Sequence, residues 1–371
     1  MTATAHQTAG IPSPVSSSPS PEAGRSDTPA IVVGTRGSAL ALWQTRYVLD
    51  RLRARHPQLA PAIEEITTRG DRTQALHIPL TQLGDKSMFV AELERALLAG
   101  ELDVAVQPMN DRALHDAELA ITAAAQPAYP QPIDAAVHSL KDLPGRLDER
   151  LVIAAVPERE DPRDALVSRH GLGLMELPAG AVVATSSLRR KAQVLHLRPD
   201  LRVTDIRGNV DTRLRKSLAP DGPDATILAA AGMKRLGLAE YITEYLPVDM
   251  MVPAVGQGAL AVEVRAGDTR LRRLLRAIDD PRTRRAVTAE RAVLAELGGG
   301  CQVPLGAHAT LSPDGQTVRL VAVVASLDGI QLVRVEREGP VARAAALGRN
   351  AARALLRGGA AEILRDILKR E

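Results

Sequence analysis

The sequence predicts an α/β protein with largely parallel sheets and a smaller C-terminal α+β domain. Short apolar strands alternate with helices over most of the chain, a pattern typical of parallel sheets. Near residue 282 the order changes, and long helices flank consecutive strands. The chain of 371 residues is too long for one ordinary hydrophobic core, so two or three domains are expected.

The first elements follow from local signals. Residues 1–28 are rich in Ser, Pro, Ala and Thr and lack the pattern of a secretory signal, so we interpret them as a disordered tail. A short strand is expected at Ile31 to Val33, followed by a tight loop over Gly34 to Gly37. Ser38 is expected to cap the next helix, which Pro57 ends.

This strand–loop–helix unit is expected to repeat along the chain. The later elements are a helix at 88–100 leading into a strand at 102–106, a strand at 151–156, and strand–turn–helix units over 181–199, 201–217 and 225–238. The C-terminal elements are helices at 283–297, 341–356 and 359–370 and strands near 305–311, 317–326 and 331–337.

One segment occurs twice. "DVAVQPMND" at 103–111 and "DAAVHSLKD" at 134–142 align with an offset of 31 residues. An insertion that happens to begin with another strand segment, and a duplicated strand and turn with one degenerate copy, both explain this. In either case the proline-rich residues 107–133 are expected to form a surface excursion. We favour 134–137 as the strand of the sheet, because that copy carries Lys141 and Asp142.

Polar and basic side chains follow the predicted strands. Since ligands of parallel α/β sheets bind beyond the carboxyl ends of the strands, these loops are expected to meet. Hydroxyl groups at helix N-termini and arginines one turn later suit carboxylates or phosphates, so the loops together predict an anion-binding cleft. The residues concerned are Thr35, Arg36, Ser38, His138, Ser139, Lys141, Thr185, Ser186, Ser187, Arg189, Arg190, Arg207, Asn209, Arg213, Lys234 and Arg235.

Asp142 is the only obvious carboxylate in this set. Among cations it is expected to be ionised, and it would suit stabilising a developing positive charge or moving a proton. A plain helix cap before "LPG" is the alternative role. No phosphate-binding loop and no metal-ligand spacing occurs, so neither a nucleotide nor a metal is predicted.

The bulk composition limits the class of protein. The net charge is +3, aromatic residues make up 2%, and no apolar run has the length of a membrane span. A nucleic-acid-binding protein would need basic faces and more aromatic residues. An exported solute-binding protein would need a signal sequence and would leave the one cysteine unexplained. We therefore expect a cytoplasmic protein with a small-molecule substrate and no membrane or nucleic-acid partner.

The single cysteine lies in "GGGCQVPLG", residues 298–306. A lone cysteine excludes an internal disulfide, and such a residue is often only a small apolar side chain. Three glycines before it give it a flexible approach. The residues alone leave packing and chemistry open.

Ten motifs occur in an order that resembles one enzyme family. They are "TRGSALALWQ", "TRGD", "FVAELERALL", "AVHSLKDLP", "EREDPRDA", "TSSLRR", "RGNVDTRL", "ILAAAGMKRLGL", "VPAVGQGAL" and "GGGCQVPLGA". Over residues 30 to 370 the chain resembles hydroxymethylbilane synthases, also called porphobilinogen deaminases. The resemblance implies that four porphobilinogen molecules are joined in turn with loss of ammonia, and that water releases the linear tetrapyrrole.

The resemblance also implies three domains and a cofactor. The first two domains are of the periplasmic-binding-protein kind. Separately from the resemblance, we expect the chain to be a monomer. Domain 1 is expected over 29–157 and 253–281 with the insertion 107–133, domain 2 over 158–252 and domain 3 over 282–371. The cofactor is a dipyrromethane joined by a thioether to Cys301.

The family's site residues transfer to matching positions. Asp142 matches the catalytic aspartate, which hydrogen-bonds pyrrole N–H groups and stabilises the cation formed as ammonia leaves. The cofactor is implied to be held by Cys301, Lys141, Thr185, Ser187, Arg189, Arg190 and Arg213, and substrate carboxylates by Arg36, Ser38, Lys86, Arg207 and Arg235.

The loop "TQLGDKSMF" departs from the family pattern. The family more usually has Lys-x-Gly-Gly-Lys-Gly before the phenylalanine, whereas Gln82, Asp85 and Ser87 replace the first lysine and two glycines. Lys86 keeps the second lysine. The resemblance implies that this loop covers the active site, but the replaced residues depart from the family's pattern for this lid.

Overall fold

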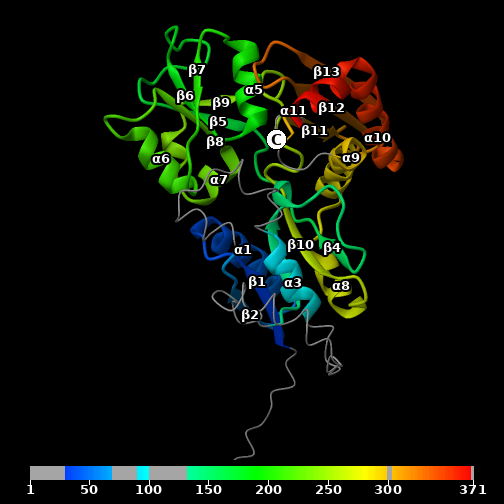
Figure 1. Cartoon of the computed structure of the whole chain (residues 1–371). Coiled ribbons are helices and arrows are strands. Elements are labelled where there is room, and N and C mark those ends of the chain that lie inside the picture. Colours follow the sequence, from blue (N-terminus) through cyan, green and yellow to red (C-terminus); the bar gives the residue numbers. More distant parts are fainter. Residues whose placement is uncertain (1–29, 69–89, 100–131, 299–302, 369–371) are drawn as a thin grey trace, which may run out of the picture.

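The computed structural model describes residues 30–68, 90–99, 132–298 and 303–368, which form three sheets and the helices that cover them (Figure 1). The predicted tail at 1–28, the strand at 102–106 and the loop containing Lys86 lie outside the described residues. Each sheet and its helices appear as a separate lobe in Figure 1. The three lobes correspond to the predicted fold class, two α/β units and a smaller α+β unit.

The first sheet has the strand order β2-β1-β3-β10-β4. β1 pairs in parallel with β2 and β3, whereas β10 runs antiparallel to both β3 and β4. The favoured strand is therefore confirmed, because β3 covers most of 134–137. The strands are β1 Ala30–Thr35, β2 Ala60–Glu65, β3 Ala135–Ser139, β4 Leu151–Ala155 and β10 Leu260–Arg265.

Two of the helices on this sheet were predicted from local signals, the one capped by Ser38 and the one at 88–100, whereas the helix at 269–275 was not. Ser38 caps α1, Ala39–Arg55, by accepting a hydrogen bond from the backbone N–H of Ala41 at 3.3 Å. The helix ends two residues before Pro57. Helix α3 spans Ala91–Ala99 and α8 spans Thr269–Leu275.

One boundary of the predicted surface excursion is wrong. Ile133 is only 1% exposed, and it packs with Leu93 and Leu97 in the core. A side-chain carbon on Gly34 would lie 2.3 Å from Ile133 Cδ1, so the glycine leaves room for the isoleucine. Residues 107–133 contain four prolines, which favoured a surface segment and hid the apolar anchor at its end. Residues 107–131 lie outside the described residues.

The second sheet repeats this arrangement in the order β7-β6-β8-β5-β9. β6, β7 and β8 are parallel, and β5 runs antiparallel between β8 and β9. Its strands are β5 Asp164–Ser168, β6 Val182–Ala184, β7 Arg202–Thr204, β8 Ala225–Ala229 and β9 Glu244–Leu246. Its helices are α5 Leu188–Leu197, α6 Val210–Leu218 and α7 Ala230–Arg235.

The C-terminal lobe is an antiparallel meander, β11-β12-β13, packed against helices. Its core joins apolar residues of α9, the first two strands and α10. The elements agree closely with the predicted ranges: α9 Pro281–Leu297, β11 Leu305–Leu311, β12 Thr317–Ala325, β13 Leu332–Pro340, α10 Ala344–Leu355 and α11 Ala361–Leu368. None of the helices in the described part has the length and apolarity needed to span a bilayer.

The chain crosses between the first two sheets twice. The first crossing segment is residues 156–163, between β4 and β5, and the second is residues 247–259, between β9 and β10. The two crossing segments lie side by side, because the backbone N–H of Glu160 donates to the carbonyl oxygen of Gly258 at 3.2 Å. Loops at the carboxyl ends of β1, β3 and β8 meet next to this point. The fold thus places the predicted polar loops around the junction of the first two sheets.

Candidate active site

A cavity of about 240 Å³ opens between the first two sheets. A smaller one of about 80 Å³ adjoins it, and Lys141 and Arg213 line both. Of the described residues that line them, Asp142 is the only carboxylate. The larger cavity brings together Arg36, Ser38, Gln44, Ser139, Lys141, Asp142, Asn209 and Arg213, and the smaller one adds Arg190 and Arg235.

Asp142 is positioned by a single turn of 3-10 helix, Leu140–Asp142, that follows β3 directly. Leu140 anchors this turn, since its side chain is 1% exposed and its backbone N–H donates to Ala259 O at 3.0 Å. The apolar residue turns inward, which leaves its polar neighbours Lys141 and Asp142 on the cavity side. The sequence "SLKD" therefore places a cation and an anion at one cavity wall.

Gln44 of α1 is a cavity residue that the sequence did not single out. It is 3% exposed, and its side-chain amide and the Ser139 hydroxyl hydrogen-bond each other, with Nε2 2.9 Å from Ser139 Oγ. This contact ties α1 to the end of β3. Little in the sequence indicated that Gln44 lines a cavity, since a single glutamine in a helix has many possible partners.

Arg213 faces other cations across the cavity. Burial, followed by the charges of Arg190 and Arg207, lowers the pKa of Arg213 to about 10, while the charge of Asp142 acts in the opposite sense. Its buried Nε has no hydrogen-bond partner among the described residues. An array of guanidinium groups that repel one another is stabilised when an anion binds among them.

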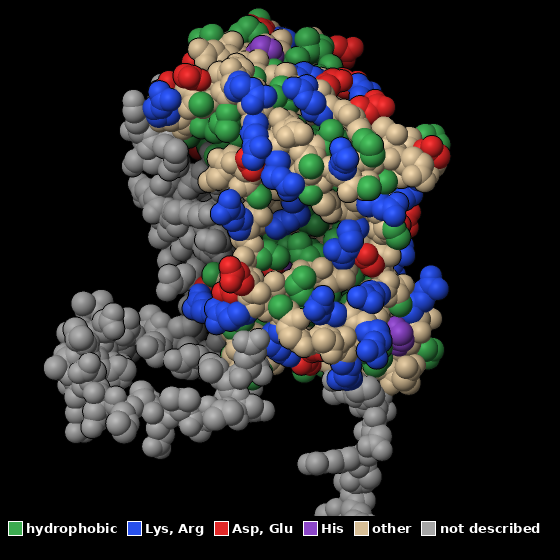
Figure 2. Space-filling view, turned by 90° about the vertical axis from the view of Figure 1, so that its right-hand side faces the viewer, with side chains coloured by type: hydrophobic (Ala, Val, Ile, Leu, Met, Phe, Trp, Pro, Cys, Tyr) green, Lys and Arg blue, Asp and Glu red, His purple; other side chains and the backbone are tan. Residues whose placement is uncertain are grey.

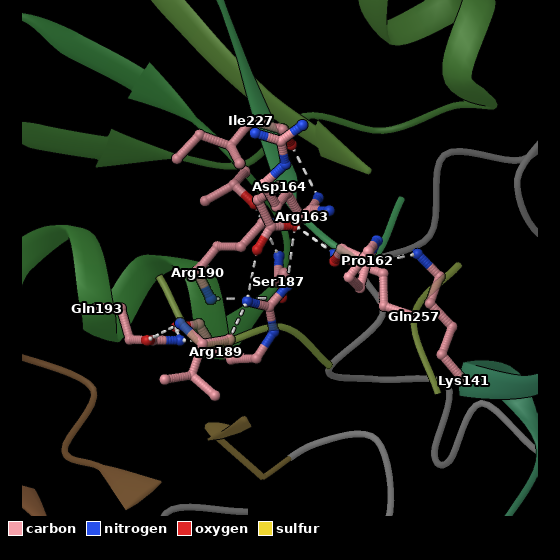
Figure 3. A network of polar contacts seen from close by, with 12 residues as sticks. Lys141, Pro162, Arg163, Asp164, Ser187, Arg189, Arg190, Gln193, Ile227 and Gln257 are labelled. Carbon is pink, nitrogen blue, oxygen red and sulfur yellow. Dashed lines mark hydrogen bonds and ion pairs between the residues drawn. The ribbon is translucent and has the colours of Figure 1, made fainter. Parts of the chain in front are cut away.

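Arg189 and Arg190 are held from behind by one carboxylate (Figure 3). Asp164 is fully buried and accepts from Arg189 Nη1 at 2.7 Å and from Arg190 Nη2 at 2.7 Å. Burial opposes ionisation of Asp164, but the two arginines outweigh it and hold its pKa well below the usual range. The "SLRR" motif is thus an oriented, buried pair and not a solvated helix start.

The remaining predicted residues lie around this core of the site. Thr185 and Ser187 lie at the N-terminus of α5, where Ser187 Oγ accepts from the N–H of Arg190 at 3.4 Å. Arg235 is 8% exposed and donates to Gly258 O at 2.7 Å, and burial lowers its pKa to about 10. Thr185, Ser187, Arg189 and Arg207 line neither cavity. Lys86 and Cys301 lie outside the described residues.

Basic groups are not confined to the cavities. Figure 2 shows Lys and Arg side chains over both the upper and the lower parts of one face, interspersed with Asp and Glu. Arg190 and Arg235 differ from these surface groups because they are buried, and Arg213 is partly buried. A desolvated guanidinium binds a carboxylate more strongly than an exposed one does. The part of the chain that the structure describes holds no cluster of His, Cys, Asp or Glu that could bind a metal.

Comparison with known proteins shows to which family this chain belongs. The family model described as "Porphobilinogen deaminase, dipyromethane cofactor binding domain" matches residues 31–131 and 125–273. The one described as "Porphobilinogen deaminase, C-terminal domain" matches residues 284–357. The chain belongs to the porphobilinogen deaminase family. The first model matches in two stretches that overlap at 125–131, next to the segment that occurs twice in the sequence.

Curated members of this family are similar over nearly their whole length. The porphobilinogen deaminase of Desulforudis audaxviator is 50% identical over 334 residues, which cover 90% of this chain and 96% of that protein. That of Roseiflexus castenholzii is 48% identical over 335 residues, covering 90% and 98%. Among solved structures, a periplasmic binding protein of Salmonella typhimurium with high arginine specificity has a TM-score of 0.36 at 12% identity, covering 69% of this chain and 96% of that one.

The family's cofactor fits the residues that the structure places here. A dipyrromethane made from two porphobilinogen units carries acetate and propionate arms, so it is a polyanion. The buried, unpaired Nε of Arg213 and the neighbouring guanidinium of Arg190 are donors suited to such arms. Among the described residues that line the two cavities, Asp142 is the only carboxylate that could repel the acidic arms of the cofactor.

Proposed function

We propose that this protein is a hydroxymethylbilane synthase that joins four porphobilinogen molecules head to tail. The observation that carries the proposal is the cavity in which Asp142 faces Lys141 and Arg213. Each addition breaks the aminomethyl C–N bond of one porphobilinogen, forms a C–C bond to a pyrrole carbon, and releases ammonia. Hydrolysis then releases the linear product. We also propose that the chain acts as a cytoplasmic monomer.

The polar and basic residues of the site divide into two groups. Lys141, Thr185, Ser187, Arg189, Arg190 and Arg213 hold the acidic arms of the dipyrromethane, which Cys301 binds covalently through its sulfur. Bound there, this group supplies the pyrrole carbon from which the chain grows. Arg36, Ser38, Lys86, Arg207 and Arg235 bind the carboxylates of the incoming porphobilinogen. Support for this division comes from the family match and from the position of six of these residues in the cavity walls.

Asp142 has the catalytic role. Its carboxylate accepts a hydrogen bond from a pyrrole N–H and stabilises the positive charge that develops on the pyrrole as the C–N bond breaks. The anchored Leu140 fixes the direction of this carboxylate before substrate arrives. Preorganised groups of this kind lower a barrier by roughly 3 kcal/mol, judged from removal of one oxyanion donor in other enzymes.

The mass of the intact protein tests the proposal. Protein purified from a host that makes porphobilinogen is expected to exceed its sequence mass by two pyrrole units, to colour with Ehrlich's reagent, and to release ammonia from porphobilinogen. The Cys301→Ala variant is the control and should carry no adduct. An unmodified wild-type chain that releases no ammonia would overturn the proposal.

A further inference from the structure

Gln257 lies at the point where the two halves of the site meet (Figure 3). It belongs to the second crossing segment, just before β10, and it is 1% exposed. Its side-chain Nε2 donates to Asp164 Oδ1 at 3.0 Å and to Pro162 O at 2.8 Å. Its Oε1 accepts from Lys141 Nζ at 3.5 Å. One amide therefore contacts the second sheet at one end and the Asp142 loop at the other.

The chemistry of the neighbours fixes which end of the amide faces which way. Asp164 and Pro162 offer only oxygen acceptors, so the NH₂ group must point toward them. The Lys141 ammonium offers only donors, so the carbonyl oxygen must point toward it. A reversed amide would set oxygen against oxygen and N–H against N–H. The glutamine thus has one orientation that satisfies all three contacts.

The backbone around Gln257 is held just as firmly. Its own carbonyl oxygen accepts from Arg159 Nε at 2.8 Å. The N–H of Gly256 donates to Glu290 Oε2 at 2.7 Å, and Gly258 O accepts from Arg235 at 2.7 Å. The backbone and the amide nitrogen of Gln257 are therefore fixed, because neither can turn without breaking several buried hydrogen bonds.

The far end of the link is the carboxylate that orients Arg189 and Arg190. Asp164 Oδ1 accepts from Arg190 Nε at 2.9 Å as well as from Gln257. A displacement of Asp164 therefore moves the arginine pair and Gln257 together. The near end is Lys141, which directly precedes Asp142 in the chain.

We propose that Gln257 is a positioning residue for the reaction. This rests on the proposed function. Gln257 fixes the position of Lys141 relative to Arg189 and Arg190. Basic groups from both sheets can then bind the same polyanion while Asp142 faces the reacting pyrrole. Removal of the amide leaves each half of the site intact but loosens one half relative to the other.

The test compares two buried glutamines. In Gln257→Met the side-chain volume is nearly kept and both ends of the link are lost. Gln193→Met is the comparison, because Gln193 is 3% exposed, uses both ends of its amide on the backbone of Val252 and lines neither cavity. Its only contact with Arg189 is to the backbone carbonyl oxygen, at 3.4 Å, and not to the guanidinium. Intact mass gives the fraction of chains that carry the adduct, thermal unfolding reports folding, and steady-state kinetics give kcat and KM.

The expected result is a split between the two variants. Gln257→Met should show a smaller adduct-bearing fraction and a kcat lower by roughly tenfold, with KM changed much less, as expected for loss of alignment and not of substrate binding. Gln193→Met should lose thermal stability to a similar extent but keep its adduct and kcat.

A second variant keeps the test decisive if Gln257→Met does not fold. Gln257→Glu preserves the shape and the acceptor for Lys141 but replaces the donor to Asp164 with an oxygen, so its kcat should also fall below that of wild type. Folded Gln257 variants with wild-type adduct and kcat would overturn this proposal alone. A wild-type chain without adduct or turnover would overturn the proposed function, and this inference with it.

Discussion

Arg159 binds Glu290 through two hydrogen bonds, from Nη1 to Oε1 at 2.6 Å and from Nη2 to Oε2 at 3.2 Å. The side chain of Glu290, on α9, is fully buried. The same carboxylate accepts from the backbone N–H groups of Gly256 at 2.7 Å and Ala309 at 2.8 Å. One acidic group therefore joins both crossing segments to the C-terminal lobe, and it lies behind the site and not in it.

The stability of the protein should depend on the ionisation of Glu290. Burial alone would raise its pKa, but the charges and hydrogen bonds of Arg159 and His308 outweigh burial and lower it to about 2 from an ordinary 4.5. A carboxyl group with a lower pKa in the folded state stabilises the fold above the unfolded pKa, and this stabilisation is lost as the pH falls from about 4.5 to about 2. It amounts to roughly 3 kcal/mol at neutral pH.

Glu290→Gln should therefore unfold more easily than wild type at pH 7, by roughly 3 kcal/mol, because Arg159 is left buried without its counter-charge. The difference between the two proteins should shrink as the pH approaches 3. Urea unfolding at several pH values measures it. Glu336→Gln is the control, since Glu336 binds Arg319 at an exposed position and should matter little. A difference that stays constant from pH 7 to pH 3 would contradict the assignment.

The carboxylate of Asp142 can be removed with little change of shape. Asp142→Asn should fold and keep its adduct, because Leu140 and not Asp142 anchors the turn. Its kcat should fall by roughly a hundredfold or more, since a neutral amide stabilises a developing cation poorly. Single-turnover release of ammonia from porphobilinogen is the measurement. Asp148→Asn, which changes an exposed aspartate paired with Arg150, should behave as wild type. Near-normal turnover of Asp142→Asn would remove this residue from its role.

Much of the site could be predicted from the sequence, because it is made of loops that follow strands. Arg36, Ser38, Lys141 and Asp142 follow β1 and β3, which are parallel neighbours, so their meeting in one cavity required only the strand pattern. Ser38 at the N-cap and the strand at 305–311 were equally local predictions, and both are confirmed.

The rest depends on partners that are distant in the sequence. β5 and β10 run antiparallel to their neighbours, which no local pattern in either strand reveals. β2 was missed because it contains Pro61 and two glutamates, which an edge strand tolerates. Asp164 and Gln257 were not singled out for the same reason, since their partners lie in other segments and only the folded chain shows them.

The glycines beside Gln257 offer a last prediction. Gly256 has a φ of +70°, and a side-chain carbon on it would lie 2.0 Å from Leu140 Cδ2. Gly256→Ala therefore combines backbone strain with a clash against the residue that anchors the Asp142 turn. The left-handed conformation alone costs an L-residue about 1–2 kcal/mol. The clash should add to this cost and should also lower kcat, because a displacement of Leu140, whose Cγ and Cβ also lie within 3.3 Å of the added carbon, would move Lys141 and Asp142 with it.

Gly237→Ala separates the two effects. Gly237 also has a φ of +70°, but a side-chain carbon there meets nothing within 4 Å. This variant should lose about 1–2 kcal/mol of unfolding free energy and keep its turnover, as expected for strain alone. Urea unfolding and steady-state kinetics on both variants give the comparison. Equal losses of stability with unchanged turnover would show that Leu140 moves aside freely. In that case the position of Asp142 would not depend on the crossing segment.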